Sequence, residues 1–486
     1  MIKLSTDANS ISVKGLDKPL KSEITVPADK SISHRAVMLG SIANGNSIIS
    51  KLSVSRDNLA TVAAFRKLGI RLETTKENKI KVHGGGLYGL KEPQSVVNTY
   101  NSGTLTRLIA GILAGNNFFS VLSGDKYLNS RPMARIIDPL TLMGAKIFGR
   151  KNNYPPLSII GSKLNPIYYD VPIPSAQVKS CLIFAGLYAD GNTVIYEKNK
   201  TRDHTERFLL LQDYPFTEEE TADGGNIINI KGGGELKPFD IEIPGDFSSA
   251  AFFIALGLLV KDSEITIKDV LLNDRRVGLI NILKRMHANV EIIDYREDFE
   301  KVGTIKASYS KLSAINIAKE DVPDMIDEFP IFAVIASFAE GVTVVRGARE
   351  LRVKETDRIK AIVMNLNKFC IKSKEYDDGF EIEGSPNYSS QLYKCNNSEI
   401  YEAFKKTGQK PVRSVNNSND FVDLNNFTEK EDAGGFYIKS YGDHRIAMSM
   451  IILALLFKNK ETVINDVRCI NTSFPNFFNI LNNIID

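Results

Sequence analysis

Residues 102–122 read SGTLTRLIAGILAGNNFFSVL: a polar start, an apolar run of helical length, a glycine turn and a β-rich segment. Five other segments repeat this order. They read SISHRAVMLGSIANGNSII (31–49), SAQVKSCLIFAGLYADGNTVIY (175–196), SSAAFFIALGLLVKDSEITI (248–267), DEFPIFAVIASFAEGVTVV (327–345) and DHRIAMSMIILALLFKNKETVI (443–464). Successive starts lie 71, 73, 73, 79 and 116 residues apart, which predicts one structural unit used six times.

Further helix and strand patterns complete the unit. A second helical pattern, such as ARIIDPLTLMGA (134–145), comes next, and in several units two strands then flank a turn, as in NIINIKGGGELKPFDIEI (226–243). A period near seventy residues is too long for a solenoid repeat and fits a βαβαββ unit. The predicted fold class is therefore α/β, with two similar domains of three units each.

The first helix of each unit is apolar nearly all round, so we expect it to be buried, with sheets wrapped around it. If the buried helices of one domain point the same way, their N-termini meet on one face. Each N-terminus carries free N–H groups and a partial positive charge. Two such faces opposed to each other would form a cleft suited to anions.

Composition excludes several classes of protein. The 486 residues are 43% hydrophobic and 24% charged, which is ordinary for a soluble protein with two or more domains. A net charge of +3 argues against a nucleic-acid or membrane-surface partner. The four cysteines lack CxxC spacing, which favours reduced thiols in a cytoplasmic protein over disulfides or zinc. We find neither a transmembrane run nor a targeting segment.

A glycine pattern at residues 84–89 matches GxGxxG. The dinucleotide interpretation requires a helix directly after the glycines, and KEPQSVV follows instead. We interpret the glycines as a turn between strands, and GGGELKP at 232–238 repeats it.

Cationic and hydroxyl side chains recur at the starts of the units. ADKSISHR (28–35) places Lys30, Ser31 and Arg35 at the first helix start, a set suited to phosphate or carboxylate. Taken alone, this motif is equally consistent with an ordinary capped helix. Later motifs add Arg107, Arg131, Arg135, Ser175, Gln177, Lys179, Thr201, Arg202 and Arg445. Capping by chance does not predict so many cations at equivalent points, so we expect an anion site.

Two carboxylates stand apart from these cations. Asp327 opens the fifth unit, and Glu355 lies in RELRVKETDR (349–358), a charge-rich run at a strand-to-helix junction. If both face the anion cleft, they are candidates for general acid and base catalysis. The alternative is that both only pair with arginines. No spacing of histidines and carboxylates suggests a metal site.

In order along the chain, DKSISHR, NSGT, RPM, SAQVKS, RDHTER, GDFSSA, ELRVKETDR and GDHRIAM resemble the motifs of the 5-enolpyruvylshikimate-3-phosphate synthase family, bacterial type. The resemblance extends from position 29 to 448. It implies the enolpyruvyl transferase fold, an inside-out α/β barrel in each of two domains. Residues 28–244 would form one domain, and residues 1–27 with 245–486 the other, with an Asn-rich insertion near 386–435.

The reaction implied by the resemblance transfers the enolpyruvyl group of phosphoenolpyruvate to the 5-hydroxyl of shikimate 3-phosphate (EC 2.5.1.19). Phosphate leaves after a tetrahedral intermediate, and no metal or organic cofactor takes part. The pathway leads through shikimate to chorismate and the aromatic amino acids. The resemblance further implies a cytoplasmic monomer whose partners are these two small molecules, with no nucleic acid or membrane.

The resemblance also assigns residues, carried over motif by motif. Shikimate 3-phosphate would be bound by Lys30, Ser31, Arg35, Ser175, Ala176, Gln177, Thr201, Arg202, Asp327 and Lys354. Phosphoenolpyruvate would be bound by Lys30, Gly103, Arg131, Gln177, Arg358 and Arg445. Asp327 would be the base toward the 5-hydroxyl, Glu355 the proton donor to C3, and Lys30 a further catalytic residue. Three positions depart from the usual family residues: Ala28 and Tyr100, where glycine is common, and Thr472, where some members have lysine.

Two other functions stay open at this point. The sister transferase that acts on UDP-N-acetylglucosamine uses a reactive cysteine in a loop of its first domain. Here that domain has only Cys181, inside an apolar helix, and DKSISHR and RDHTER favour the shikimate substrate. A non-catalytic anion-binding protein would be indicated by loss of Asp327, Glu355 or Lys30, and all three are present.

Overall fold

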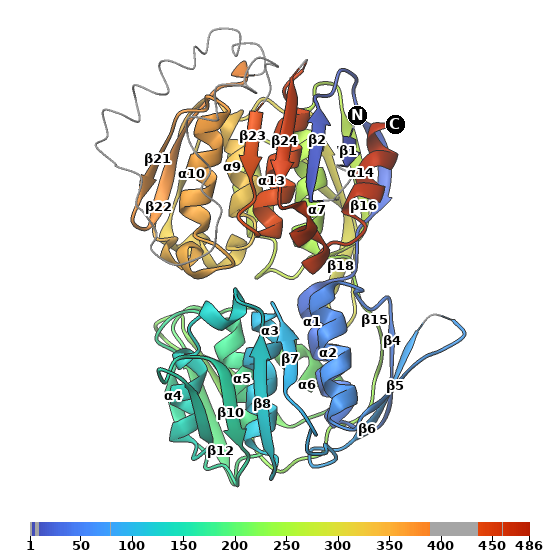
Figure 1. The fold of residues 1–486 in the computed structure, drawn as a ribbon, viewed down its shortest axis with the longest axis vertical. Helices are drawn as coiled ribbons and strands as arrows, with labels where there is room; N and C mark the ends of the chain where they lie inside the picture. Colours follow the sequence, from blue (N-terminus) through green and yellow to red (C-terminus); the bar gives the residue numbers. More distant parts are fainter. Residues whose placement is uncertain (1, 5–8, 78, 389–435, 459) are drawn as a thin grey trace.

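A computed structural model describes residues 2–4, 9–77, 79–388, 436–458 and 460–486. Within these ranges the chain forms two lobes, one above the other (Figure 1). Most of the expected insertion near 386–435 lies outside the described residues. Among the helices of these ranges, none has both the length and the apolar character needed to cross a bilayer.

The lobes are built from similar units of helices and strands. The lower lobe contains α1 (Lys30–Ile42), β4 (Asn44–Ser50), α2 (Arg56–Lys67), β5 (Arg71–Thr74), β6 (Ile80–Gly85), β7 (Val97–Tyr100), α3 (Gly103–Ala114), β8 (Phe119–Gly124), α4 (Ala134–Leu142), β9 (Lys146–Arg150), β10 (Tyr154–Ile160), β11 (Tyr168–Asp170), α5 (Ala176–Gly186), β12 (Asn192–Glu197), α6 (His204–Leu211), β13 (Phe216–Glu220), β14 (Asn226–Lys231) and β15 (Asp240–Glu242). The upper lobe contains β1 (Ile2–Leu4), β2 (Ser10–Lys14), β3 (Lys21–Thr25), α7 (Phe247–Leu259), β16 (Glu264–Leu271), α8 (Gly278–Arg285), β17 (Asn289–Glu297), β18 (Lys301–Ser308), β19 (Asn316–Ile317), α9 (Phe329–Ser337), β20 (Gly341–Val345), η4 (Arg349–Val353), α10 (Arg358–Lys368), β21 (Ser373–Tyr376), β22 (Gly379–Gly384), β23 (Phe436–Lys439), α13 (His444–Leu455), β24 (Glu461–Asn465), η8 (Val467–Thr472) and α14 (Phe477–Ile485).

The described strands form six four-stranded sheets of one topology. In each sheet an edge strand runs parallel to its neighbour, and the other pairs are antiparallel. In the first sheet Asp240 of β15 pairs with Ile48 of β4 in parallel, and Ser47 of β4 pairs with Val82 of β6 antiparallel. This confirms the βαβαββ unit predicted from the repeats.

Three sheets take strands from distant parts of the chain. β15 supplies the edge strand of the first lower sheet, β3 that of the first upper sheet, and the antiparallel pair β1 and β2 completes the last sheet beside β24. The chain therefore crosses between the lobes twice, and the crossings are bonded to each other. The N–H of Asp29 donates to Pro244 O at 2.7 Å, and the N–H of Asp246 donates to Pro27 O at 2.7 Å. We therefore propose the domain division expected from the sequence, 28–244 against 1–27 with 245–486.

The first helix of each unit is buried because it presents apolar side chains on all sides. In α7 every residue from Phe247 to Leu258 is buried. Most buried apolar side chains of the described ranges group into one cluster in each lobe, and Ile11 and Leu20 join the upper one although they precede the first crossing. A helix surrounded in this way can face a bound ligand only at its ends.

Side-chain caps mark the starts of five of these six helices. The caps are Asp29 (α1), Ser102 (α3), Ser175 (α5), Asp246 (α7) and Asp443 (α13), each accepting from a backbone N–H of the first turn. At the start of α9, Glu328 makes no such bond. A capping side chain satisfies only some of the free N–H groups of a first turn. The others keep the positive end of the helix open to an anion.

Gly84, in the last strand of the first unit, shows how closely a sheet approaches its buried helix. A Cβ at this position would overlap the carbonyl oxygens of Gly40 and Ala43 at the end of α1. We therefore expect Gly84→Ala to lower the free energy of unfolding by about 3 kcal/mol, the upper end for overpacking. Gly86 is the matched control, with φ +75° and nothing within 4 Å of an added Cβ. Gly86→Ala should cost about 1 kcal/mol through backbone strain. Urea unfolding measures both, and equal losses would contradict the close approach.

Candidate functional site

The two lobes face each other across a junction (Figure 1). Charged side chains from both lobes form ion pairs there. Arg202, just before α6 in the lower lobe, places Nη2 2.8 Å from Oδ2 of Asp327 in the upper lobe. Arg135 of α4 donates two parallel hydrogen bonds, both 2.8 Å long, to the carboxylate of Glu350 in η4. Charged groups from both lobes therefore meet between them, at the place where the sequence predicts an anion site.

Glu355, between η4 and α10, lies among guanidinium groups. Its Oε2 accepts from Arg358 Nη2 at 2.7 Å, and its Oε1 lies 3.6 Å from Arg131 Nη2. Arg358 is buried and donates through Nε to Asp443, the cap of α13, at 2.8 Å. Nη1 of Arg358 is buried and has no hydrogen-bond partner among the described residues. One donor of this guanidinium is therefore free for a ligand.

Asp327, ahead of α9, is surrounded by four arginines. Besides Arg202, its Oδ2 lies 3.5 Å from Arg276 Nη1 and 3.9 Å from Arg445 Nη2. Its Oδ1 lies 3.7 Å from Arg358 Nη1. Arg445 also donates to the backbone carbonyl of Asp327 at 3.2 Å. The two carboxylates singled out in the sequence thus share one cationic site, and Arg358 contacts both.

The arginines set the ionisation of these two carboxylates. Burial raises the pKa of Asp327, but the charges of Arg445 and Arg202 lower it by more, to well below its ordinary value. Burial likewise raises the pKa of Glu355, and Arg358 and Arg131 bring it well below its ordinary value. Both side chains are therefore ionised at neutral pH in this structure. An anion that engages the same arginines would weaken this effect and raise both pKa values.

The start of α3 brings guanidinium and amide groups together. A Cβ on Gly103 would lie 3.0 Å from Arg107 Nη1 and 3.1 Å from Arg131 Nη1, so the absence of a side chain lets both arginines approach the helix end. Arg107 donates to Gln177 Oε1 at 2.8 Å, and Gln177 Nε2 donates to Thr104 Oγ1 at 3.0 Å. The amide of Gln177 is thereby held in one orientation. Arg107 was noted in the sequence as a cation but not assigned a substrate.

Lys30 and Arg35, both from the first motif, have different surroundings. Lys30, the first residue of α1, forms an ion pair with the buried Asp57 of α2. Arg35 is buried and donates to Thr205 Oγ1 at 2.7 Å and Ser180 Oγ at 2.8 Å. Burial lowers the pKa of Arg35 to about 10. Most of the N–H groups of Arg35 therefore donate within the lower lobe, where they link α1 to α5 and α6.

Lys179, counted among the cations of the site in the sequence, belongs to a buried network instead. Its Nζ lies 2.7 Å from Glu197 and 2.7 Å from Glu206, and it donates to the carbonyl of Thr201 at 3.2 Å. The hydroxyl of Thr201 also donates to Glu197, at 2.7 Å. The network fixes the backbone just ahead of Arg202. Lys179 therefore supports the site without facing it.

The remaining predicted residues lie at the same junction. Ser175 caps α5, and Ala176 is the first residue of that helix. Ser31 follows Lys30 in the first turn of α1, and its carbonyl accepts from Arg35 at 3.1 Å. Lys354 directly precedes Glu355, and burial lowers its pKa.

Arg276, two residues before α8, was missed in the sequence. It is 2% exposed, and its Nη2 lies 2.8 Å from Asp246 and 3.3 Å from Asp29, the caps of α7 and α1. It thus joins the two crossings of the chain and also faces Asp327. The only signal was the pair of arginines at 275–276 ahead of a helix, which does not distinguish a buried side chain from an exposed one.

The three positions that depart from the usual family residues all lie in the described part of the chain. Ala28 forms a bridge with Gly245, where the chain crosses between lobes. Tyr100 has φ +48°, the left-handed region that glycine adopts without strain, so a tyrosine here costs backbone energy. Thr472 is the last residue of η8.

Asp203, His204 and Glu300 form a group of possible metal ligands within the described ranges, with donor atoms within 4.8 Å of one another. His204 Nδ1 lies 2.6 Å from Glu300, and Arg207 Nε lies 2.9 Å from Asp203 and 3.4 Å from Glu300. Because a guanidinium already pairs with both carboxylates, we interpret the group as a hydrogen-bonded link between lobes. The absence of a metal from the reaction stays a prediction.

Comparisons with known proteins agree over nearly the whole chain. A family model described as EPSP synthase (3-phosphoshikimate 1-carboxyvinyltransferase) matches residues 16–401 and 413–481. The 3-phosphoshikimate 1-carboxyvinyltransferase of Pelobacter propionicus is 43% identical over 475 residues, covering 97% of this chain and 98% of that protein. EPSP synthase from Acinetobacter baumannii has a TM-score of 0.78 at 37% identity, covering 98% of both chains. The enolpyruvyl transferase NikO from Streptomyces tendae matches with a TM-score of 0.70 at 14% identity over 98% of this chain and 97% of its own, which shows a shared fold.

The buried network around Lys179 makes a testable prediction. Lys179→Met leaves Glu197 and Glu206 buried without their cation, which should cost about 3–5 kcal/mol of unfolding free energy. The matched control is Lys200→Met, because Lys200 pairs at 3.1 Å with Glu220, whose side chain is 66% exposed. That substitution should cost less than about 1 kcal/mol. Urea denaturation of both variants checks this, and similar small losses would show that Lys179 is not the cation of a buried network.

Proposed function

The chain belongs to the EPSP synthase family, and we propose from this membership and from the site that it transfers the enolpyruvyl group of phosphoenolpyruvate to the 5-hydroxyl of shikimate 3-phosphate. The hydroxyl oxygen adds to C2 of phosphoenolpyruvate while C3 gains a proton, which gives a tetrahedral intermediate. Loss of phosphate and of a C3 proton then forms the enol ether. The protein is a transferase of the shikimate pathway to chorismate and the aromatic amino acids.

One observation carries the proposal: Asp327 and Glu355 lie in a single site among arginines from both lobes. Each substrate carries a phosphate and a carboxylate, so four anionic groups must be held close together. Guanidinium groups suit phosphate and carboxylate because their N–H donors form a planar fork. The two carboxylates then remain for proton transfer to and from the reacting carbons and oxygens.

For phosphoenolpyruvate, we propose binding by Lys30, Gly103, Arg131, Gln177, Arg358 and Arg445. Two features of the site support this set. Nη1 of Arg358 and Nε of Arg131 are buried donors without a hydrogen-bond partner in the part of the chain that the structure describes. Gly103 lets the guanidinium groups of Arg107 and Arg131 lie beside the start of α3, so an anion bound there can contact these cations and the N–H groups of the helix together.

For shikimate 3-phosphate, we propose binding by Lys30, Ser31, Arg35, Ser175, Ala176, Gln177, Thr201, Arg202, Asp327 and Lys354. The contact between Arg202 and Asp327 supports this set, because it joins a residue of each lobe at 2.8 Å. Thr201 gives its hydroxyl proton to Glu197, so its oxygen can accept a hydrogen bond from a substrate hydroxyl. Thr201 therefore fits the alcohol groups of the ring better than the phosphate.

The acid and base roles follow from the charges. Asp327 is held ionised by Arg445 and Arg202, which is the state that a base toward the 5-hydroxyl requires. Glu355 must carry a proton before it can donate one to C3. Binding of phosphoenolpyruvate to Arg358 and Arg131 would engage the cations that lower the pKa of Glu355, and so favour its protonation. Lys30, at the start of α1, would stabilise the developing charge.

We propose a monomer, because both lobes of one chain supply the site. We also propose a cytoplasmic location and a reaction without metal or organic cofactor.

The transferase that acts on UDP-N-acetylglucosamine is disfavoured as an alternative. Burial raises the pKa of Cys181 to about 12, and the residue lies within α5, so it cannot serve as a reactive thiolate.

Steady-state kinetics with separate ligand titrations test the carboxylate roles. Glu355→Gln keeps size and hydrogen bonding but removes the acid, so kcat should fall by about 10²–10⁴-fold. Binding of shikimate 3-phosphate should change little. Asp327→Asn should also lower kcat and should weaken shikimate 3-phosphate binding more, because the base must already touch the hydroxyl.

The competing explanation is that both carboxylates only brace arginines. Each substitution would then loosen phosphoenolpyruvate binding and lower stability while kcat stayed near normal. A Glu355→Gln enzyme with unchanged kcat would reject the acid assignment.

A further inference from the structure

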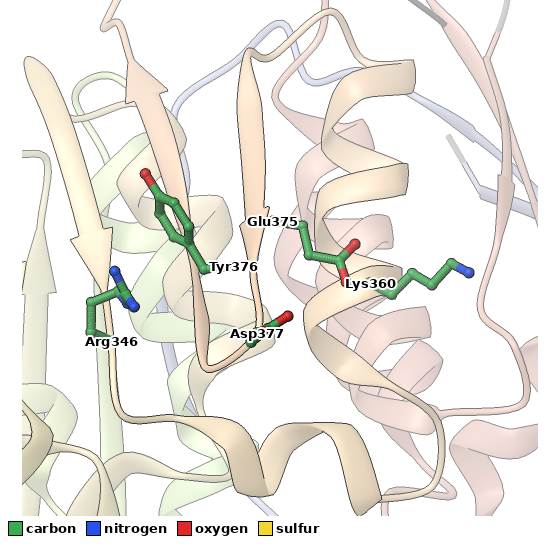
Figure 2. Close-up of a pocket in the computed structure, with 5 residues that line it drawn as sticks. All are labelled: Arg346, Lys360, Glu375, Tyr376 and Asp377. Atoms are coloured by element: carbon green, nitrogen blue, oxygen red, sulfur yellow. The ribbon is translucent and has the colours of Figure 1, made fainter. Parts of the chain in front are cut away.

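A surface pocket of about 570 Å³ lies beside the run that carries Lys354, Glu355 and Arg358. It is lined by Arg346, Lys360, Glu375, Tyr376 and Asp377. Figure 2 shows these side chains around the turn between β21 and β22 and the start of α10. The pocket gives access to the groups that hold one further arginine, Arg352.

Arg352, in η4, contacts the β21–β22 turn with all three nitrogens of its guanidinium. Nε donates to the carbonyl of Asp377 at 2.8 Å, and Nη2 donates to the carbonyl of Tyr376 at 2.6 Å. Nη1 lies 2.8 Å from the carboxylate of Glu375. Planar, divergent donors of this kind fix direction as well as distance.

The same guanidinium also reaches the start of α10. Nη1 of Arg352 donates to Oδ2 of Asp357 at 2.7 Å. The other oxygen of Asp357 accepts from the backbone N–H of Lys360 at 3.1 Å and so caps α10. Arg352 therefore ties both ends of the segment 353–357 to the end of β21 and the turn that follows it. That segment contains Lys354 and Glu355, and Arg358 follows it directly.

We propose that Arg352 is a positioning residue for catalysis, which holds Glu355, Lys354 and Arg358 at the distance from the lower lobe that the transfer requires. The inference rests on the proposed function. Arg352 contacts neither Glu355 nor a lower-lobe side chain among the interactions of the described residues, so it acts through the backbone. A displacement of about 1 Å in a catalytic group can cost about 10²-fold in rate.

The test compares Arg352→Lys with Arg346→Lys. Lysine keeps the charge at 352 but cannot reproduce four directed contacts. We expect Arg352→Lys to lower kcat by about 10–100-fold, with shikimate 3-phosphate affinity within about threefold of wild type, because most of its proposed contacts lie on the lower lobe. Arg346 is the matched control: it contacts Asp378 at 2.7 Å and the ring of Tyr376 at 4.7 Å on the same hairpin. Arg346→Lys should keep kcat within about twofold of wild type.

Chemical rescue separates positioning from general destabilisation. In Arg352→Ala, millimolar ethylguanidinium should restore kcat severalfold because the pocket admits it to Glu375, Tyr376 and Asp377, whereas ethylammonium should not. Assays run well below the unfolding midpoint of each variant, and Arg352→Lys serves if the alanine variant fails to fold. A folded Arg352→Lys with kcat within twofold of wild type would overturn the inference. So would an equal loss in Arg346→Lys. If wild type itself transferred no enolpyruvyl group, the proposed function would fail as well.

Discussion

Six helices that are apolar on every side must be buried on every side, and the rest of the structure depends on this constraint. Each helix is enclosed by sheets of one topology, and close approach is possible because positions such as Gly84 carry no side chain. Because their sides are enclosed, only the helix ends can face a bound ligand. The starts of the helices lie at the junction of the lobes, where their N–H groups and partial charges make an environment for anions.

The junction must also balance many guanidinium groups inside the protein, because a buried cation without a partner is costly. Asp327 and Glu355 supply part of this balance. Pairing with arginines and proton transfer, posed as alternatives from the sequence, are therefore compatible. A carboxylate that balances an arginine in one state can lose that partner to a substrate anion in the next. The resulting change in pKa is what an acid–base residue needs.

The repeats predicted the units, the buried helices and the helix caps, because apolar periodicity and capping are local properties of the chain. The positions of β2 beside β24 and β3 beside β16 support the proposed crossing near Ala28. The direction of long cationic side chains was not predictable in the same way. Lys179 points into a buried pair of glutamates, and Arg276 joins the two crossings. Such directions depend on carboxylates far away in the sequence, which no local pattern reveals.

The central claim is that one anion site between two lobes accepts phosphoenolpyruvate and shikimate 3-phosphate and joins them. Release of inorganic phosphate from phosphoenolpyruvate, measured with each acceptor in turn, tests it most directly. We expect rapid release and an enolpyruvyl product with shikimate 3-phosphate, and none with UDP-N-acetylglucosamine. Transfer to UDP-N-acetylglucosamine, or binding of both ligands without turnover, would contradict it.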